Sequence, residues 1–343
     1  MSDMSELSKE KLPKVSIIIP VKNEERTIAN TINSILRIDY PYYEVLLVDG
    51  GSEDQTLSIV KKIKGNPHPL ENKLRIIKTN DSMPSQGRNV GIRNSLGEIV
   101  AFVDGDCYVA KDWLKNAVAL LERKGVGGVG GQVISCRKGA YLSRALLDIA
   151  STFFASAGST LFIRHRSEKE VENIPSCHAV YHREAVERAG LYPEDLRFCE
   201  DVDLNHRIRR LGYRLLYSSD VVVEHDWKVR SFGSLFRFMF GYGAGRSFAC
   251  KKYNRLFSLL YAVPSIALFG LLFLSLLSFI YGGLFLYALG LSLCSYGILA
   301  FVSAFLAAYQ FKDKKMVVLA PVAYVTMHIG YAIGFIWGLI KKR

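Results

Sequence analysis

A long stretch of uncharged sequence limits what the C-terminal third of this chain can fold into. Residues 256–311 contain no Asp, Glu, Lys or Arg across 56 positions. A helix needs about 20 apolar residues to cross the hydrocarbon core of a bilayer. The stretch therefore predicts two transmembrane helices, with a turn near Tyr281-Gly282-Gly283, in a multi-pass protein of the cell membrane.

A short basic segment, Lys312-Asp313-Lys314-Lys315, separates this stretch from a third apolar run over residues 316–340. Lys and Arg accumulate in cytoplasmic loops, so we expect this segment and the catalytic part of the chain to face the cytoplasm. Two crossings before residue 312 are compatible with that orientation. A third crossing would place Lys341-Lys342-Arg343 outside, against the same rule, and the sequence leaves open whether residues 316–340 span the membrane.

The net charge of +12 is confined to the end of the chain. Residues 1–227 hold 31 basic and 31 acidic residues, whereas residues 228–343 hold 13 and 1. A basic segment attracts either nucleic acid or an anionic membrane surface. Residues 228–255 combine seven basic residues with interleaved aromatics and no acid, which is typical of helices in a membrane interface. We therefore expect membrane lipids as a partner, and no nucleic acid.

Residues 14–227 alternate short apolar runs with stretches of helical spacing. The apolar runs are typical of strands buried on both faces of a parallel sheet, and they cover Val15–Pro20, Glu44–Asp49, Leu74–Thr79 and Ile99–Val103. The pattern predicts an α/β domain with a doubly wound, mostly parallel sheet. A disordered lead over residues 1–13 should precede it, and interfacial helices at 228–255 and a membrane domain of about three helices at 256–340 should follow.

Two carboxylates follow the last of these strands, in Asp104-Gly105-Asp106. Open α/β sheets bind ligands beyond the carboxyl ends of their strands, and Gly105 permits close approach of the backbone. Mg²⁺ and Mn²⁺ prefer carboxylate and phosphate oxygens. A solvated turn is the alternative for an isolated Asp-x-Asp pattern. Its position after a buried strand favours a divalent cation site, at the sheet edge where Asp49 also ends a strand.

Five short motifs in a fixed order resemble a known family. They are Pro20-Val21-Lys22-Asn23-Glu24, Val48–Thr56, Gly87-Arg88-Asn89-Val90-Gly91, Asp104-Gly105-Asp106 and Glu200-Asp201. Together, over residues 14–227, they resemble the inverting family-2 glycosyltransferases of the GT-A fold. The C-terminal part resembles the subgroup that assembles exopolysaccharides and lipid-linked glycans. The resemblance implies sugar transfer from a nucleotide-diphosphate sugar donor to a hydroxyl of a lipid-linked or polysaccharide acceptor.

The resemblance also implies which residues contact the donor. These would be Pro20, Val21, Glu24, Asp49, Arg88, Asp104 and Gly105. Among them, Asp49 would bond the base, Arg88 would face the diphosphate pocket and Asp104 would lie near the ribose. The sequence departs from the family pattern at Gly50, where many members carry a second acid.

The remaining implied roles concern the metal and the acceptor. Asp106 would hold Mg²⁺ or Mn²⁺ on the diphosphate, and His225, after the last predicted strand, would complete the metal site. Asp201 would deprotonate the acceptor, with Glu200 supporting it. A hydroxyl is a poor nucleophile at neutral pH and needs a positioned base. Asp201 opens a predicted helix, whose dipole favours its charged form.

Three other functions compete with this one. The first is a polyprenyl-phosphate glycosyltransferase, whose acceptor oxygen is already anionic. The second is a membrane-tethered subunit that binds nucleotide sugars without catalysis, which the presence of Asp106 and Asp201 disfavours. The third is a processive synthase, whose Gln-x-x-Arg-Trp motif is missing from residues 228–255.

Overall fold

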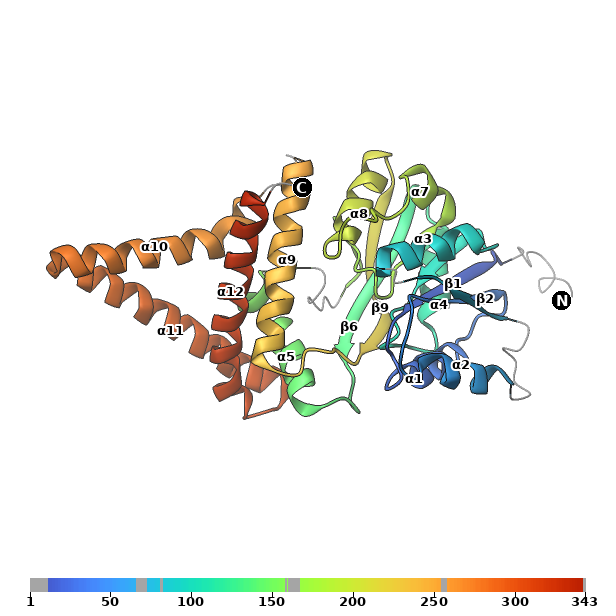
Figure 1. The fold of residues 1–343 in the computed structure, drawn as a ribbon, viewed down its shortest axis with the longest axis horizontal. Coiled ribbons are helices and arrows are strands. Elements are labelled where there is room, and N and C mark those ends of the chain that lie inside the picture. The colour runs from blue at the N-terminus through green and yellow to red at the C-terminus, as the bar shows by residue number, and fades with distance from the viewer. Residues whose placement is uncertain are drawn as a thin grey trace, which may run out of the picture. The chain divides into compact units, whose positions relative to one another are not determined.

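The computed structural model describes residues 12–65, 73–80, 83–157, 159, 167–253 and 258–341. Residues 1–11 of the predicted lead lie outside the described part. The elements, many of which are labelled in Figure 1, are β1 (Val15–Val21), α1 (Ile28–Ile35), β2 (Tyr43–Asp49), α2 (Thr56–Gly65), β3 (Leu74–Lys78), α3 (Pro84–Asn94), β4 (Ile99–Phe102), β5 (Cys107–Val109), α4 (Trp113–Leu121), β6 (Val126–Ser135), α5 (Tyr141–Ala150), α6 (Phe153–Ser156), β7 (Lys169–Glu170), β8 (Val180–His182), α7 (Arg183–Arg188), α8 (Glu200–Arg210), β9 (Arg214–His225), α9 (Phe232–Lys252), α10 (Leu259–Tyr281), α11 (Gly283–Phe311) and α12 (Met316–Ile340).

The chain divides into two compact units. The first comprises residues 1–131, 167–194 and 204–223, and the second comprises residues 132–166, 195–203 and 224–343. The boundary passes through β6, α8 and β9, which contribute residues to both units. Each unit is described by itself below.

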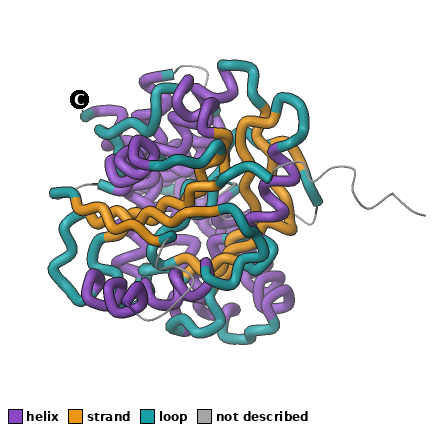
Figure 2. Tube along the Cα trace, turned by 90° about the vertical axis from the view of Figure 1, so that its right-hand side faces the viewer, coloured by secondary structure: helices purple, strands orange, loops and turns teal. Residues whose placement is uncertain are grey.

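A nine-stranded sheet in the order β3-β2-β1-β4-β8-β6-β9-β5, with β7 paired to β9, confirms the predicted α/β class. Strands β3, β2, β1 and β4 are parallel, and β8 joins β4 in antiparallel fashion. The strands, orange in Figure 2, lie side by side with helices flanking them. The four parallel strands correspond to the four apolar runs of the sequence, because strands covered on both faces need few polar residues.

Strand register brings the carboxyl ends of segments that are distant in the sequence to one edge of the first unit. Val21 pairs with Asp49, Asp49 pairs with Lys78, and Ile18 pairs with Phe102. Parallel strands therefore end together, and the Asp104-Gly105-Asp106 turn follows Phe102 and Val103 at the same edge. This is the ligand-binding edge of an open α/β sheet.

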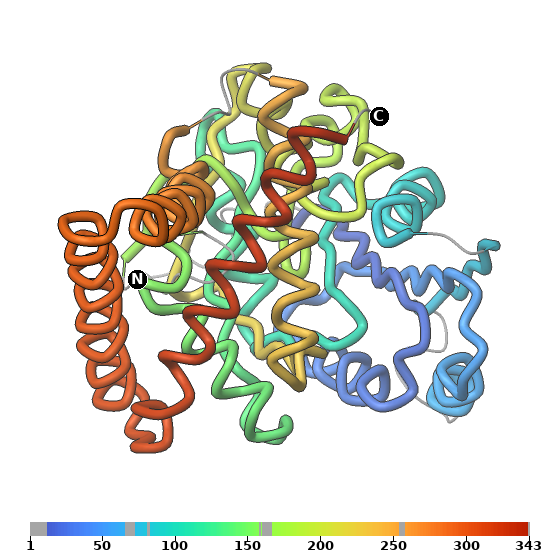
Figure 3. Tube along the Cα trace, turned by 60° about the vertical axis from the view of Figure 1, so that its left-hand side comes forward, coloured from blue at the N-terminus to red at the C-terminus, as the bar shows by residue number. Residues whose placement is uncertain are grey.

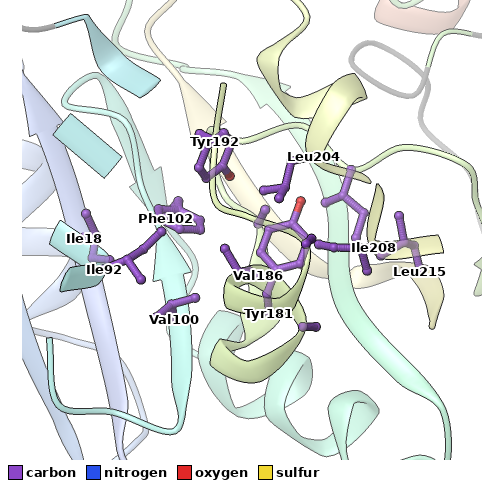
Figure 4. Close-up of a cluster of buried hydrophobic side chains, with 14 of the residues drawn as sticks. Ile18, Ile92, Val100, Phe102, Tyr181, Val186, Tyr192, Leu204, Ile208 and Leu215 are labelled. Carbon is purple, nitrogen blue, oxygen red and sulfur yellow. The ribbon is translucent and has the colours of Figure 1, made fainter. Parts of the chain in front are cut away.

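Phe102 lies in the main hydrophobic core of the first unit (Figure 4). Its ring meets the edge of the Tyr192 ring at a centroid distance of 5.3 Å and lies 6.1 Å from the ring of Tyr181. Ile18 of β1 and Leu204 of α8 belong to the same cluster. The core therefore anchors the strand that delivers the acidic turn.

The second unit contains three helices that are long and apolar enough to cross a membrane, among the described residues. They are α10, α11 and α12, with 23, 29 and 25 residues. The turn between α10 and α11 falls at Gly282, as the sequence predicts, with φ of 58°. Helix α12 differs from the other two helices in its burial. Of its most apolar 18 residues 44% are buried, whereas the corresponding share is 6% for α10 and 17% for α11.

Helix α12 owes its burial chiefly to α9, which lies alongside it (Figure 3). A Cβ atom on Gly334 would lie 2.0 Å from the carbonyl oxygen of Phe240, and one on Gly338 would lie 2.7 Å from that of Ala244. Residues further along α12 meet residues further along α9, so the two helices run parallel. Glycines at every fourth position of α12 let the two backbones approach closely.

The sequence predicts interfacial helices over residues 228–255, and the described part of this range contains helix α9. Its side chains Leu235 and Met239 are buried in the core of the second unit, as is Ala249 in a small cluster with Cys199. At its C-terminal end, Lys251 Nζ donates to the carbonyl oxygens of Gly338, Leu339 and Lys341 at 2.9–3.1 Å. One face of α9 is thus occupied by protein.

Replacing Gly334 with Leu should break this helix pair. The new side chain would meet backbone atoms of Phe240, which cannot rotate away, and overpacking of this kind costs about 1–3 kcal/mol or more. Gly290→Leu on α11 is the matched control, because nothing lies within 4 Å of a Cβ built there. We expect a lower melting temperature in detergent for Gly334→Leu alone. Equal melting of the two variants would contradict the close packing of α9 on α12.

Candidate active site

Two loops at the carboxyl edge of the sheet are tied together in the first unit. The Asn23 backbone N–H donates to Ser52 Oγ at 3.0 Å, and the Asn23 side-chain oxygen accepts from the Glu53 N–H at 2.9 Å. Asn23 adopts a left-handed φ of 56°, a conformation that Asn tolerates better than most residues. The loop after β1 and the loop after β2 therefore form one wall. Sequence reasoning quoted Asn23 in a motif but assigned it no role.

Asp49 ends β2 and is 3% exposed. Both of its carboxylate oxygens accept from the Ser52 N–H, at 3.2 and 3.3 Å. The turn between them contains Gly51, whose φ of 84° explains a glycine at that position. The carboxylate is thus oriented by its own loop.

Glu24 and Gly105 lie against each other. A Cβ on Gly105 would lie 2.8 Å from Glu24 Cγ and 3.1 Å from Val21 Cγ1, so only glycine fits between these side chains. The Thr31 hydroxyl donates to the Gly105 carbonyl oxygen at 2.8 Å, and the Thr27 hydroxyl donates to Glu24 Oε2 at 3.0 Å. The structure therefore brings together three of the predicted donor residues, Val21, Glu24 and Gly105.

Arg88 and Asp104 form an ion pair of 2.7 Å between Nη2 and Oδ1. Arg88 is 2% exposed, whereas the Asp104 side chain is 30% exposed. The guanidinium carbon also lies 5.5 Å from the centre of the Tyr192 ring. The preceding Gly87 packs on Pro20, where a Cβ would lie 3.2 Å from the Pro20 Cβ. Motif reasoning missed Tyr192, because it lies more than 100 residues from Arg88 in the sequence.

Asp106 lies in the turn between β4 and β5 and is 7% exposed. The Cys107 N–H donates to the Asp104 carbonyl oxygen at 3.0 Å and closes this turn. Burial raises the pKa of the Cys107 thiol well above its usual range, so the thiol stays neutral beside Asp106. Two carboxylates in one tight turn, one of them partly exposed, offer the hard oxygen donors that fit Mg²⁺ or Mn²⁺.

The predicted acceptor residues lie in the second unit. Glu200 and Asp201 occupy the first turn of α8 and are half-buried. Asp201 Oδ1 accepts from the Val202 N–H at 2.8 Å. The helix is preceded by Cys199, which is buried and has a left-handed φ of 62°. Asp201 therefore stands at a helix N-terminus, as predicted, where its charged form is favoured.

An ion pair between a buried carboxylate and a partly exposed lysine joins the start of α8 to α9. Asp203 is fully buried, and its Oδ2 accepts from Lys252 Nζ at 2.6 Å. The Asp203 backbone N–H also donates to the Cys199 carbonyl oxygen at 3.2 Å. A pair of this kind holds the helix in one position, because moving either charge away from the other is costly. It therefore supports the orientation of Asp201, two residues earlier.

His225 ends β9 and also belongs to the second unit. It is half-buried, and its backbone carbonyl oxygen accepts from the Cys136 N–H at 3.1 Å. The predicted donor residues and Asp106 thus lie in the first unit, and His225, Glu200 and Asp201 lie in the second. The roles of all these residues remain predictions.

Comparisons with known proteins agree with the fold and the motifs. The family model described as "Glycosyl transferase family 2" matches residues 16–190. "Glycosyltransferase AglE" of Haloferax volcanii is 32% identical over 68% of this chain and 73% of its own length. "Dolichyl N-acetyl-alpha-D-glucosaminyl phosphate 3-beta-D-2,3-diacetamido-2,3-dideoxy-beta-D-glucuronosyltransferase" of Methanococcus voltae is 26% identical over 95% of this chain and 97% of its own.

A solved structure shows the same fold over nearly the whole chain. It is the mannosyltransferase PcManGT from Pyrobaculum calidifontis in complex with GDP-Man and Mn²⁺, with a TM-score of 0.61, 22% identity and coverage of 96% of this chain and 88% of that one. At this identity the likeness concerns the fold alone, and it confirms the predicted GT-A class. On the family match and the AglE relationship together, the chain belongs to glycosyltransferase family 2.

Proposed function

We propose that this protein is a membrane-bound, metal-dependent, inverting glycosyltransferase that moves a sugar from a nucleotide-diphosphate donor to a hydroxyl of a lipid-linked or polysaccharide acceptor. The observation that carries the proposal is the sheet edge of the first unit, where Asp49, Glu24 and the Asp104-Gly105-Asp106 turn are held in place by neighbouring side chains. The relatives support it, since they are named glycosyltransferases and one is named for a dolichyl-phosphate-linked sugar.

On the donor side, each residue has a physical task. Asp49 accepts hydrogen bonds from the base, and Glu24 and Gly105 form the floor on which the nucleotide lies. The Arg88 guanidinium orients Asp104 toward the ribose through their 2.7 Å ion pair and adds positive charge near the diphosphate. Pro20 and Val21 complete the wall at the end of β1.

Mg²⁺ or Mn²⁺ would be held by Asp106, with His225 as a further ligand. When bound, the cation would offset the negative charge that builds on the leaving diphosphate. The Mn²⁺ in the PcManGT complex supports a divalent cation as cofactor. Asp106 is well suited to this task because its turn is closed by the hydrogen bond from the Cys107 N–H to the Asp104 carbonyl oxygen and its carboxylate oxygens are hard donors.

On the acceptor side, Asp201 takes the proton of the attacking hydroxyl, and Glu200 keeps the local charge negative. Attack from the face opposite the leaving diphosphate inverts the configuration of the transferred sugar. The polyprenyl-phosphate alternative needs no such base, because its nucleophile is already ionised. The position of Asp201 at the start of α8 therefore favours a hydroxyl acceptor.

The apolar helices support a location of this protein at a membrane. Helices α10 and α11 are largely exposed and apolar, and the basic segment Lys312-Asp313-Lys314-Lys315 that follows α11 suits anionic headgroups. We propose a multi-pass protein of the cell membrane whose catalytic domain faces the cytoplasm. A tethered enzyme and a lipid-anchored acceptor meet with less loss of entropy than two free molecules.

The experiment uses the full chain, purified in detergent and reconstituted in vesicles with a membrane lipid extract. UDP- and GDP-sugars are screened with Mn²⁺ and Mg²⁺, and release of nucleoside diphosphate is measured together with transfer of labelled sugar to lipid. We expect one donor class to be consumed, and nuclear magnetic resonance of the product should show an inverted anomeric centre. Donor binding without release or transfer under every condition would point to the non-catalytic alternative.

A further inference from the structure

Arg246 is a buried cation in the second unit. It is 8% exposed, and its Nη2 donates to the Tyr242 hydroxyl at 3.1 Å. Its Nε has no hydrogen-bond partner, and no acidic side chain in the described part of the chain forms an ion pair with it. The guanidinium carbon lies 4.6 Å from the ring centre of Tyr261 and 5.7 Å from that of Tyr242.

Such a site leaves positive charge uncompensated. Arginine remains protonated inside proteins, and removing its charge from water is expensive unless an anion neutralises it. Stacking on two tyrosine rings offsets part of this penalty, but a ring face supplies no acceptor for the Nε–H. A missing anionic partner explains both the uncompensated charge of Arg246 and its unpaired Nε–H.

The groups around Arg246 suit a phosphate. A guanidinium matches phosphate oxygens with paired hydrogen bonds. Tyr261 belongs to the first turn of α10, whose N-terminus begins at Leu259, and helix N-termini attract anions. The Tyr242 hydroxyl, which accepts from Arg246 and lies 3.1 Å from Ser159 Oγ, completes a polar wall.

The position of this cluster identifies the kind of molecule that would carry the phosphate. On one side α10 continues as an exposed apolar helix. On the other side α9 contacts the segment before α8, since a Cβ on Gly245 would lie 2.6 Å from the Phe198 carbonyl oxygen. The Cys199 thiol donates to the Tyr242 carbonyl oxygen at 3.7 Å, and Asp201 follows two residues later. A ligand here has an apolar chain on one side and the proposed base on the other.

We propose that Arg246, together with Tyr242 and Tyr261, binds the phosphate of a lipid-linked acceptor next to Asp201. The proposal rests on the proposed function and narrows its acceptor to a phosphate-bearing lipid rather than a free polysaccharide. The lipid chain lies along α10, the phosphate contacts Arg246, and the sugar hydroxyl reaches Asp201. Arg246 positions the substrate by binding its phosphate, and it takes no part in proton transfer.

Binding of polyprenyl phosphate by the full chain in neutral phosphatidylcholine nanodiscs tests this site. We expect Arg246→Gln to weaken binding by about 10–100-fold, as for a lost charge-assisted hydrogen-bonded pair, and Arg246→Lys to restore part of it. The matched control is Arg237→Gln, which removes the same charge from an exposed position of the same helix. Its binding should equal that of the unchanged protein.

Three further probes separate the sources of phosphate. Polyprenol without phosphate, inorganic phosphate and phosphatidylglycerol should each bind far more weakly than polyprenyl phosphate. Equal binding of polyprenol would overturn the phosphate site, and equal binding of phosphatidylglycerol or inorganic phosphate would overturn the acceptor assignment. These comparisons use the unchanged protein, so they decide the question even if Arg246→Gln does not fold.

The binding measurement needs neither donor nor turnover. It can therefore fail while sugar transfer succeeds, which would reject the site alone, or succeed in a protein that transfers no sugar. In an active protein, Arg246→Gln should raise the KM for the lipid acceptor and leave the KM for the nucleotide sugar unchanged. A fall in melting temperature with no change in lipid affinity would assign Arg246 a purely structural role and reject the proposal.

Discussion

Replacing Asp201 with Asn should reduce sugar transfer by about 10²–10⁴-fold, the usual contribution of a positioned general base. Asn has nearly the same shape, and its side-chain oxygen can still accept from the Val202 N–H, as Asp201 Oδ1 does at 2.8 Å. The start of α8 should therefore remain intact. Nucleotide-sugar binding should persist, because the predicted donor residues lie in the first unit.

Transfer rates and donor affinity are measured on the same preparation of Asp201→Asn. Asp195→Asn, which neutralises an exposed carboxylate shortly before α8, serves as the control and should transfer normally. Normal transfer by Asp201→Asn would reject the base assignment. Efficient glycosylation of polyprenyl phosphate by this variant would instead favour the phosphate acceptor described above as an alternative.

Replacing Asp106 with Ala should reduce transfer by about 10³-fold or more, since a cation that neutralises the leaving diphosphate is worth several kcal/mol. EDTA should have the same effect on the unchanged protein, and added Mn²⁺ should reverse it. Asp106→Ala should also lose Mn²⁺ binding in the presence of nucleoside diphosphate, measured by calorimetry. The variant should retain its melting temperature within a few degrees, because the turn is also held by the Thr31 hydroxyl on the Gly105 carbonyl oxygen and by the Cys107 N–H on the Asp104 carbonyl oxygen.

The control for Asp106 is Asp39→Asn, which removes a carboxylate from a surface ion pair with Lys115 at 3.6 Å. Surface pairs of this kind contribute little to stability, so activity and Mn²⁺ binding should not change. Full activity of Asp106→Ala, or of the unchanged protein in EDTA, would remove the metal from the proposed mechanism.

The parallel half of the sheet could be predicted from sequence because its evidence is local. Each strand is a short apolar run, and each is followed by polar residues that end at one edge, so Asp49 and Asp104 could be assigned to the same side of the domain. The fold class follows from the alternation of elements. The motif order then predicted the family that the comparisons confirm.

Contacts between distant segments could not be predicted in this way. Tyr192 beneath Arg88 and Asn23 against Ser52 depend on how loops meet in space. The aromatic and basic residues of 228–255 predict a membrane interface, and the same segment forms α9, which also packs on α12. Composition cannot distinguish a lipid surface from the face of another apolar helix. The regular spacing of Gly330, Gly334 and Gly338 was the signal that α12 packs on α9.

The α9–α12 pair affects how many helices we expect to cross the membrane. Two helices in contact along their lengths lie at similar depths, and α9 carries Arg237, Lys251 and Lys252, which are costly to place in a hydrocarbon core. We therefore expect α12 to stay with α9 at the membrane surface, although its sequence is apolar enough to span. In that arrangement α10 and α11 would cross the bilayer once in each direction. The basic residues around 312–315 would then lie on the same side as α9.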